Sequence, residues 1–458
     1  MFRVSLCILL FCLLSGCFLD KADIKVTDKK QKVLIPGTSE VALARKGVIE
    51  DKKGVVKNKS INKTQKTNVP KNQKQIEKKF QPKPKYEDIN IKELPEFQDA
   101  KKSLEKLTNN TKSRNYGKVT SSDKLTVAVI TYMSGQNLKI GQDVMKSVEV
   151  AHEKLGNDNI NVVFLDINSP NILSGITSDI SVIIGPHTKE EVEKVYPSIK
   201  KNAIPFLPLT YSMDLVGRDY IYMMGISTID QALRDVSYAI QNVHDNIYTI
   251  LPNNVDGEKI LELLKNYKKF GDIDKLFVER YTPGSQDSML SAVQKIKPDL
   301  AKADYFRSAF LLNEYTSDAS YLKPVENYLK RMFVMGGSSF HNYPNNVPTL
   351  LMYFADVPIA ARYEFLNRFK SRYNTEPSDA AYLVYDAAAL VMALSIDLNG
   401  KVSFDPGALN NQAGFEGMNG VFRFRKDGTI ERLLSIFRKS GDKVSMLDNE
   451  KSSFQDNE

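Results

Sequence analysis

Polar side chains that could bind a small ligand follow several short apolar runs of the sequence. Hydroxyl, amide and backbone N–H groups suit a carboxylate, and an acidic side chain suits an ammonium group. The chemistry expected of such a set is non-covalent capture of a zwitterion such as an amino acid. The alternative is that each is an ordinary polar loop residue. The candidates are Ser134, His187, Thr188, Thr210, Tyr211, Asn253, Asn254, Glu314 and Ser338.

Catalytic and metal chemistry finds no support in the residue types. The chain has four histidines without metal-ligand spacing, and its three cysteines, Cys7, Cys12 and Cys17, all lie near the N-terminus. It has no phosphate-binding loop, no glycine-rich dinucleotide motif and no nucleophile elbow. We therefore expect no catalytic residue, no metal and no cofactor, and hence no enzyme activity.

The N-terminal segment has the features of an export signal. Arg3 precedes an apolar run over residues 4–14, which is long enough for a secretory signal and too short to span a bilayer. The run ends in Leu14-Ser15-Gly16-Cys17, which resembles the lipobox of bacterial lipoproteins. We expect residues 1–16 to be a signal peptide and Cys17 to carry the lipid that holds the protein on a membrane. Phe18 in place of Asp implies the outer membrane in a Gram-negative cell, with the protein facing the periplasm.

Charge is divided unevenly along the chain. Residues 21–120 carry 26 Lys and Arg against 12 Asp and Glu, whereas residues 121–458 carry 36 against 42. The Lys-, Asn- and Gln-rich stretch over 17–120 cannot bury enough apolar surface to fold, which predicts a disordered tether. Its span would be roughly 55 Å, and its full extension about 300 Å. Its lysines either solvate the linker or attract anionic polymer or lipid. The acidic balance of the remainder argues against nucleic-acid binding.

From residue 125 onward, short apolar runs alternate with helical patterns. Strands are expected at 125–130, 160–166, 180–184, 204–207 and 220–224, and then at 247–251, 276–280, 305–312 and 331–335. Helices are expected at 141–155, 189–202, 257–270, 287–296, 322–329, 361–373 and 380–396. A hairpin of 420–425 and 429–437 follows, with Asp427-Gly428 in its turn. This alternation predicts parallel strand–helix–strand units.

The pattern predicts an α/β fold of two lobes with doubly wound parallel sheets. The domain is expected over 121–448, with lobe I at about 124–226 and 359–400 and lobe II at about 228–355. A C-terminal hairpin at 414–440 and a disordered tail at 449–458 complete the prediction. Because ligands of open α/β sheets bind beyond the carboxyl ends of the strands, the candidate residues are expected to line a cleft between the lobes.

Several motifs resemble a known family. Ile183-Ile184-Gly185-Pro186, the stretch 204–209 and the helix around 381–388 are similar to leucine-type (type I) periplasmic binding proteins. The penicillin-binding-protein activator lipoproteins are a closer match, over about 124–448. That likeness rests on the stretches 185–190, 222–225, 251–254, 281–287 and 414–424. The resemblance implies the two-lobed type I fold.

Two departures distinguish the chain from amino-acid receptors of this type. Those receptors resemble one another in a run of small hydroxyl residues after the glycine of the second loop, where this chain has His187-Thr188-Lys189-Glu190. They also tend to carry an aromatic residue before glycine in the loop that matches Asn253–Gly257, where this chain has Asn254-Val255-Asp256-Gly257. Both departures favour the activator interpretation, in which the domain contacts a protein.

The leading hypothesis is therefore a non-enzymatic, lipid-anchored regulator of a peptidoglycan synthase, a penicillin-binding protein, which the tether allows the domain to reach. The alternative is a receptor that captures a small polar ligand, such as an amino acid, and delivers it to the permease of an ABC importer.

Overall fold

The structure is a computed structural model that describes residues 33–34, 114–156, 158–312, 320–337, 350–358, 360–398, 401–448 and 454. The predicted signal peptide and Cys17 lie outside the described residues. The predicted tether also lies outside them up to residue 113, apart from Val33–Leu34. Among the candidate ligand residues, Glu314 and Ser338 are outside the described residues as well.

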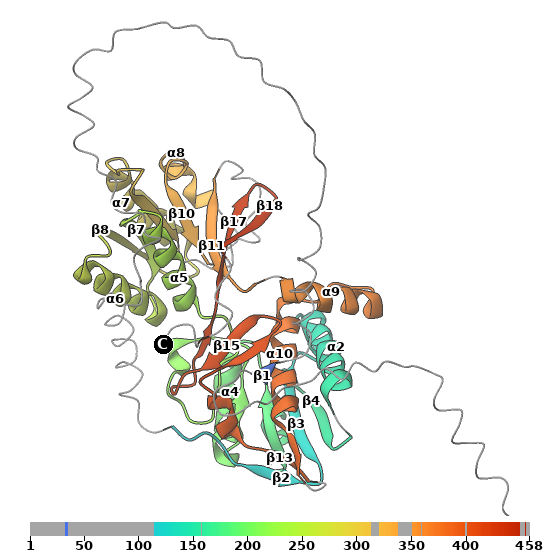
Figure 1. Cartoon of the computed structure of the whole chain (residues 1–458). Helices are drawn as coiled ribbons and strands as arrows, with labels where there is room; N and C mark the ends of the chain where they lie inside the picture. Colours follow the sequence, from blue (N-terminus) through green and yellow to red (C-terminus); the bar gives the residue numbers. More distant parts are fainter. Residues whose placement is uncertain are drawn as a thin grey trace, which may run out of the picture. The chain divides into compact units, whose positions relative to one another are not determined.

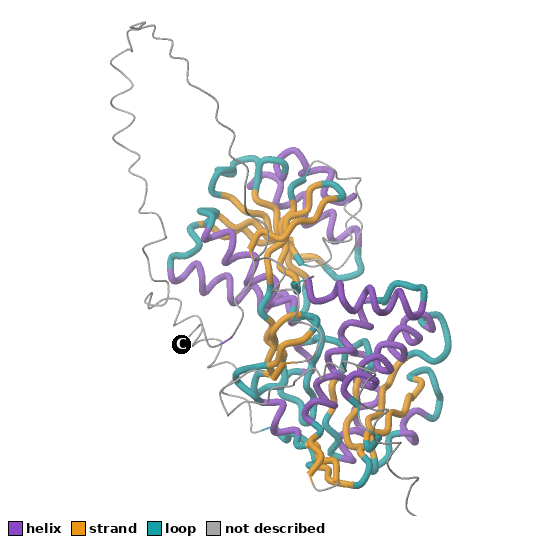
Figure 2. The backbone as a smooth tube through the Cα atoms, turned by 45° about the vertical axis from the view of Figure 1, so that its right-hand side comes forward, coloured by secondary structure: helices purple, strands orange, loops and turns teal. Residues whose placement is uncertain are grey.

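Lobe I is built on a four-stranded parallel sheet of order β4-β3-β5-β6. Its strands are β3 (Leu125–Thr131), β4 (Ile160–Asp166), β5 (Ile180–Ile184) and β6 (Phe206–Leu207). Its helices are α2 (Leu138–Leu155), α3 (Ile172–Gly175), α4 (Lys189–Asn202), α9 (Ala360–Tyr373) and α10 (Asp379–Leu394). One apolar core joins the sheet to α2 and α10, and another joins it to α4. The apolar runs of β3 and β5 are needed because helices cover both faces (Figures 1 and 2).

Two small sheets complete lobe I. The first contains β2 (Thr120–Ser122), β12 (Ile396–Leu398) and β13 (Lys401–Phe404). The second contains β1 (Val33–Leu34), β14 (Phe415–Gly417), β15 (Gly420–Phe424) and β16 (Ile430–Arg432). Short 3₁₀ helices lie at Met213–Leu215 (η5) and Pro406–Asn410 (η8). The aromatic side chains of β14 and β15 enter the same core as α2 and α10, so the second sheet is an integral layer of this lobe.

Lobe II is built on a seven-stranded sheet of order β18-β17-β11-β10-β9-β7-β8. The parallel strands are β7 (Asn246–Pro252), β8 (Lys275–Tyr281), β9 (Ser308–Leu312), β10 (Phe333–Gly336) and β11 (Met352–Asp356). The antiparallel strands are β17 (Ser435–Ser440) and β18 (Lys443–Asp448). Its helices are α5 (Thr228–Gln241), α6 (Val255–Phe270), α7 (Gln286–Leu300), η6 (Ser320–Val325) and α8 (Glu326–Leu329). The fold is therefore the α/β architecture with parallel sheets that the sequence predicts (Figure 1).

The predicted single strand over 429–437 is wrong. Leu433 and Leu434 separate β16, which pairs with β15 in lobe I, from β17, which pairs antiparallel with β11 in lobe II. The chain thus passes from one sheet to the other at this point, as it also does between β6 and α5 and between β11 and α9. Both leucines are buried, so the apolar run continues from β16 into β17. The sequence pattern therefore gives no sign that the chain changes sheet here.

Three further expectations need correction. The stretch 220–224 forms one isolated bridge, Phe206 with Ile221, and not a strand. The helix expected at 322–329 divides into η6 and α8. Helix α5 was not expected at all, although Ser227 caps it by accepting a hydrogen bond from the Asp230 amide at 3.1 Å. The bounds of β4, β5 and α4, by contrast, agree with the sequence prediction.

Each lobe begins with a strand and a helix that approach closely. A Cβ atom on Gly141 in α2 would lie 1.7 Å from the carbonyl oxygen of Tyr132, and one on Gly257 in α6 would lie 2.0 Å from that of Pro252. Only glycine allows helix and strand backbones to come so near. Both helices therefore begin directly above the carboxyl end of the first strand of their lobe.

A fully buried asparagine, Asn419, connects the hairpin to the helices of lobe I. Its Oδ1 accepts hydrogen bonds from Arg362 in α9, the shorter at 2.6 Å. Its Nδ2 donates to Asp386 at 2.7 Å and to the carbonyl of Tyr382 at 3.0 Å, both in α10. Every polar atom of this side chain is thus bonded, and the turn between β14 and β15 is fixed against α9 and α10.

Asp386 and Arg432 extend this arrangement. The buried Asp386 carboxylate accepts the amides of Met418 at 2.7 Å and Asn419 at 3.0 Å. Arg432 in β16 donates to the carbonyl of Asn419 at 3.2 Å and to that of Met224 at 3.0 Å. One buried polar network therefore joins the stretch after β6, helix α10 and both strands of the hairpin.

We predict that Asn419→Ala lowers the free energy of unfolding by about 3 kcal/mol, because it leaves groups of Arg362 and Asp386 without partners in a buried place. Chemical denaturation measures the change. Asn253→Ala, at an exposed position, is the matched control, with an expected change within about 0.5 kcal/mol. Equal and small effects of the two substitutions would contradict the role given to Asn419.

Candidate functional site

The loop after β5 holds His187 and Thr188 at the N-terminus of α4. Thr188 is the N-cap residue, and its hydroxyl accepts a hydrogen bond from the amide of Glu191 at 3.2 Å. The Glu191 carboxylate in turn accepts the amides of His187 and Thr188, both at 3.1 Å. Amides at a helix N-terminus are a general binding place for anions. Here a carboxylate of the chain itself occupies them.

His187 packs against the end of β3. Its ring stacks on Tyr132 with centroids 4.9 Å apart, and its Nε2 lies 3.0 Å from the hydroxyl of Thr131. Burial lowers the pKa of His187 to about 4, against a smaller opposing effect of Glu191. Burial also raises the pKa of Tyr132 to about 12, and a hydrogen bond to Glu191 acts in the same direction. The imidazole is therefore neutral at pH 7 and serves as a packed aromatic ring.

Ser134 and Asp166 join the loops after β3 and β4. The Ser134 hydroxyl donates to the Asp166 carboxylate at 2.6 Å, and the amides of Met133 and Asn168 donate to the same group, each at 3.1 Å. Burial would raise the pKa of Asp166, but these hydrogen bonds lower it below its usual value. The hydroxyl of Ser134 therefore already donates its hydrogen bond to Asp166 and does not offer it to a ligand.

Thr210 and Tyr211 follow β6. The carbonyl of Thr210 accepts the amide of Gly225 at 3.2 Å, and the Tyr211 hydroxyl donates to the sulfur of Met213 at 3.4 Å. Burial raises the pKa of Tyr211 above its usual range. In the next turn, the amide of Met213 donates to Asp256 of α6 at 3.4 Å, so the edge of lobe I here contacts the edge of lobe II.

Asn253 and Asn254 lie at the corresponding edge of lobe II. Asn254 is the N-cap of α6, and its Oδ1 accepts the amide of Gly257 at 2.9 Å. Asn253 is exposed, and its main-chain N–H donates to the carbonyl of Tyr281 at 2.7 Å. The structure therefore brings all seven described candidates to the strand edges of their lobes, but the side chains of Ser134, Thr188 and Asn254 are committed to bonds within the protein.

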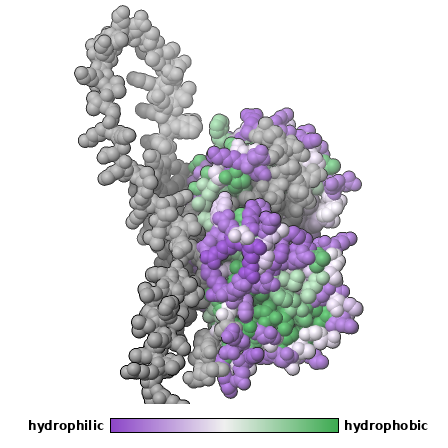
Figure 3. Space-filling model, turned by 90° about the vertical axis from the view of Figure 1, so that its right-hand side faces the viewer, coloured by the Kyte–Doolittle hydropathy of each residue, from purple (hydrophilic) through white to green (hydrophobic). Residues whose placement is uncertain are grey.

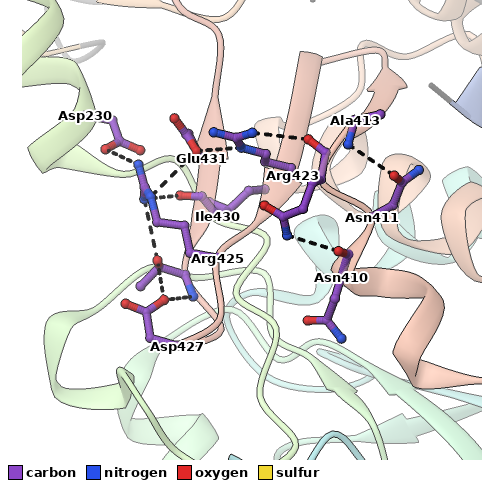
Figure 4. A network of polar contacts seen from close by, with 11 residues as sticks. Asp230, Asn410, Asn411, Ala413, Arg423, Arg425, Asp427, Ile430 and Glu431 are labelled. Atoms are coloured by element: carbon purple, nitrogen blue, oxygen red, sulfur yellow. Dashed lines mark hydrogen bonds and ion pairs between the residues drawn. The ribbon is translucent and has the colours of Figure 1, made fainter. Parts of the chain in front are cut away.

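The sequence analysis missed an ionic network between the lobes. Arg425, just after β15, contacts Asp230 in the first turn of α5 with 3.0 Å between Nη2 and Oδ1 (Figure 4). Its Nη1 donates to the carbonyl of Ile430 at 3.0 Å, and its Nε lies 3.8 Å from Glu431. Burial opposes the charge of Arg425, but Asp230 and Glu431 outweigh it and raise its pKa. The only sequence signal was the alternation Phe422-Arg423-Phe424-Arg425, which predicts the basic face of a hairpin.

Metal binding and membrane insertion find no support in the described part of the chain. There, no group of three or more His, Cys, Asp or Glu side chains is arranged to hold a metal ion. None of the helices in the described ranges has the length and apolar character needed to cross a bilayer.

Comparisons with known proteins agree on the architecture. A family model described as "Periplasmic binding protein" matches residues 124–443. No curated protein matches the sequence. Among the solved structures that are similar to the chain, three are each 13% identical to it, and at this identity the similarity shows the fold alone.

The first of these is full-length LpoA from Haemophilus influenzae, with a TM-score of 0.53 and coverage of 72% of this chain and 60% of LpoA. This chain thus spans about 60% of the length of that protein. The C-domain of the same LpoA, described as a regulator of PBP1A, has a TM-score of 0.52, with coverage of 70% of this chain and 99% of the domain. A putative branched-chain amino acid ABC transporter from Rhodospirillum rubrum has a TM-score of 0.57, with coverage of 71% of this chain and 100% of that one.

We predict a pH dependence of stability that originates from His187. Its folded-state pKa of about 4 lies below the reference value of 6.5, so the unfolded chain binds the proton first. The stability contributed by the neutral ring is fully present above pH 6.5 and is lost as the pH falls toward 4. Between pH 7 and 4.5, the free energy of unfolding of the wild type should fall by about 2 kcal/mol more than that of His187→Gln. Denaturation at both pH values measures this, and parallel pH profiles of the two proteins would contradict it.

Proposed function

We propose that this chain, which belongs to the periplasmic binding protein family, is a non-enzymatic envelope protein that binds and regulates a peptidoglycan synthase. The family match covers residues 124–443, so membership extends over the whole two-lobed region. The proposal goes beyond family membership in one respect: it names a protein, and not a small solute, as the binding partner of this chain.

The observation that carries the proposal is the occupation of the α4 N-terminus by Glu191. A solute with a carboxylate would need the amides of His187 and Thr188, and both already donate to Glu191 at 3.1 Å. A competing ligand must displace a carboxylate that is held in place by the helix itself, and must also unmake the cap on Thr188. The side chains of Ser134 and Asn254 are committed to bonds within the protein as well, which leaves a solute fewer free polar groups at the strand edges.

Exposed apolar residues give a protein partner a surface to bind. At the edge of the lobe I sheet, Met133 in the loop after β3, Leu138 at the start of α2 and Leu173 in α3 expose 41%, 37% and 45% of their surface. Figure 3, which views the right-hand side of Figure 1, has an apolar area in its lower half, the half that contains lobe I. Exposed apolar patches of this kind are typical of protein–protein contact sites.

The described relationship of LpoA to PBP1A supports this choice of partner class, although it concerns another protein. We further propose that Cys17 is the lipid attachment site, that the anchor lies in the outer membrane, and that residues 17–113 allow the domain to reach a synthase across the periplasm. A flexible chain of about 100 residues has the reach for this, with roughly 55 Å r.m.s. span and about 300 Å at full extension.

An amino-acid receptor is the second candidate. One observation favours it: the putative branched-chain amino acid transporter protein is matched over its entire length, so nothing in its architecture is missing here. In that case the free hydroxyl of Thr210 and the candidate residues Glu314 and Ser338 would have to provide the recognition that Thr188 does not.

We predict that the full-length wild-type protein does not bind free amino acids. Isothermal titration calorimetry with each proteinogenic amino acid at up to 1 mM should give no binding heat. The melting temperature should also stay constant, because a ligand at 100 times its Kd would stabilise the fold by about 2.7 kcal/mol. Saturable heat with leucine or another amino acid would overturn the protein-partner proposal and support the receptor.

We predict that crosslinking in intact envelopes, followed by purification of the tagged full-length protein, recovers a peptidoglycan synthase. Because the proposed contact relies on exposed apolar side chains and not on the hydroxyl groups of the candidate residues, Ser134→Ala and Thr210→Val should recover it to the same extent as the wild type. If the lipid anchor holds the protein on the membrane from which it reaches the synthase, Cys17→Ser should reduce recovery of the synthase at least tenfold. Recovery of an importer permease in place of a synthase would contradict the proposal.

A further inference from the structure

The prediction of a disordered tether over 17–120 is wrong for its last residues, because Arg114, the first of them that the structure describes, is buried. It exposes 5% of its surface, and its guanidinium lies 4.4 Å above the ring of Tyr222. The guanidinium also donates to the carbonyl of Ile221 and, through Nε at 3.3 Å, to that of Lys426. The Nε and Nη1 atoms of Arg114 thus donate to main-chain carbonyls of lobe I, while Nη2 is buried without a hydrogen-bond partner, so the side chain is packed into lobe I and is not a loose chain end.

The residues that follow Arg114 form a strap along lobe I. The Asn115 amide donates to the carboxylate of Asp219 at 2.8 Å, and the Asn115 carbonyl accepts the amide of Tyr220 at 2.8 Å. The Lys118 amide donates to the carbonyl of Ala203 at 2.9 Å, and β2 then pairs with β13. We call residues 114–122 the strap. A pull on the chain before residue 114 therefore acts first on the Arg114 contacts.

The turn between β15 and β16 touches Arg114 directly. A Cβ on Gly428 would lie 2.8 Å from the Arg114 Nη1, so the guanidinium packs against the turn backbone. The turn is internally rigid: the Asp427 carboxylate accepts both the amide and the hydroxyl of Thr429, at 2.9 and 2.6 Å. The amide of Met223 further donates to the carbonyl of Gly428 at 2.9 Å. A displacement of Arg114 thus moves the turn as a unit.

The same turn begins with Arg425, whose side chain crosses to lobe II. The Arg425–Asp230 pair leaves 18% and 14% of the two side chains exposed. At that exposure solvent screens the pair less than a surface salt bridge, and removing one partner leaves the other charge buried without compensation. Asp230 belongs to the first turn of α5, which packs on the lobe II sheet. The turn therefore contacts Arg114 on one side and, through Arg425 and Asp230, the second lobe on the other (the latter contact is drawn in Figure 4).

We propose that the strap couples the tether to the contact between the lobes, with Arg114, the turn 425–429 and the Arg425–Asp230 pair as successive members of the relay. A load on the tether, or its release, changes how firmly lobe II is held against the hairpin of lobe I. This inference does not depend on which partner or ligand the domain binds.

Coupling between two places in a protein is reciprocal, and this gives a test. Hydrogen exchange of the full-length protein is compared in Arg114→Met and Arg425→Met. Arg114→Met should accelerate exchange in the first turn of α5 about tenfold, the effect of losing about 1.4 kcal/mol of local stability. Arg425→Met should accelerate exchange of the Asn115 and Lys118 amides by a similar factor.

Arg423→Met is the matched control. Arg423 lies in β15, two residues before Arg425, and pairs with Glu431 at 2.8 Å; it also donates to the carbonyl of Gln412 and lies over the ring of Phe454, and none of these contacts is with lobe II. It should leave exchange in both α5 and the strap at wild-type rates. If Arg114→Met unfolds the protein, Asp219→Ala loosens the strap from an exposed bond and should accelerate exchange in α5 as well. Unchanged exchange in α5 when the strap is loosened, or equal effects of Arg423→Met and Arg425→Met, would overturn the relay.

Discussion

The position of the C-terminal hairpin depends on one buried polar group, the side chain of Asn419. It holds the turn between β14 and β15 against α9 and α10, while its main-chain carbonyl holds Arg432 of the next strand. Buried polar networks specify structure strongly because any unsatisfied member costs several times what a hydrogen bond contributes. The hairpin therefore has one orientation on lobe I. That orientation aims Arg425 at lobe II and brings the following residues, Leu433 and Leu434, to the crossing between the sheets.

The third passage of the chain between the lobes, from β16 to β17, connects the lobes through a strand and not only through linking segments. The chain that leaves lobe I at Leu433 enters lobe II as β17, between β11 and β18. Arg234 in α5 then donates to the carbonyl of Leu434 at 3.1 Å and pairs with Asp448 in β18 at 2.6 Å. The last strands are therefore held by the first helix of lobe II, next to Asp230. A lobe movement would strain this region as well as the contact of Met213 with Asp256.

Hydrophobic periodicity was sufficient to predict most of the architecture, because buried parallel strands need uninterrupted apolar runs. Helix α5 was missed although its signals are in the sequence: Ile229, Ala232, Val236 and Ala239 recur at helical spacing after the N-cap Ser227. What the pattern does not show is how the buried Gln231 of this helix is satisfied, because its partner, the carbonyl of Ala355 at 2.9 Å, is 124 residues away. The prediction of a strand over 429–437 failed because its apolar run continues through a change of sheet.

The sequence predicts that the candidate residues follow the carboxyl ends of strands, but it does not show whether their polar atoms are free to bind a ligand. The carboxyl ends of parallel strands determine where Thr188 and Asn254 lie, and the sequence gives that edge. Whether their polar atoms are free depends on neighbours one helical turn later. The spacing from Thr188 to Glu191 is that of a capping box, a signal present in the sequence that the search for ligand donors passed over.

That capping box decides more than helix stability. Glu191 is attached to the helix whose amides it accepts, so its effective concentration at that place is far above any level a free solute reaches. A free carboxylate would need additional contacts to compete, and the neighbouring hydroxyl of Ser134 is bonded to Asp166. Within a fold that commonly encloses solutes, binding energy is therefore more readily available on the outer surfaces of the lobes than between them. This is the physical reason to look for a macromolecular partner.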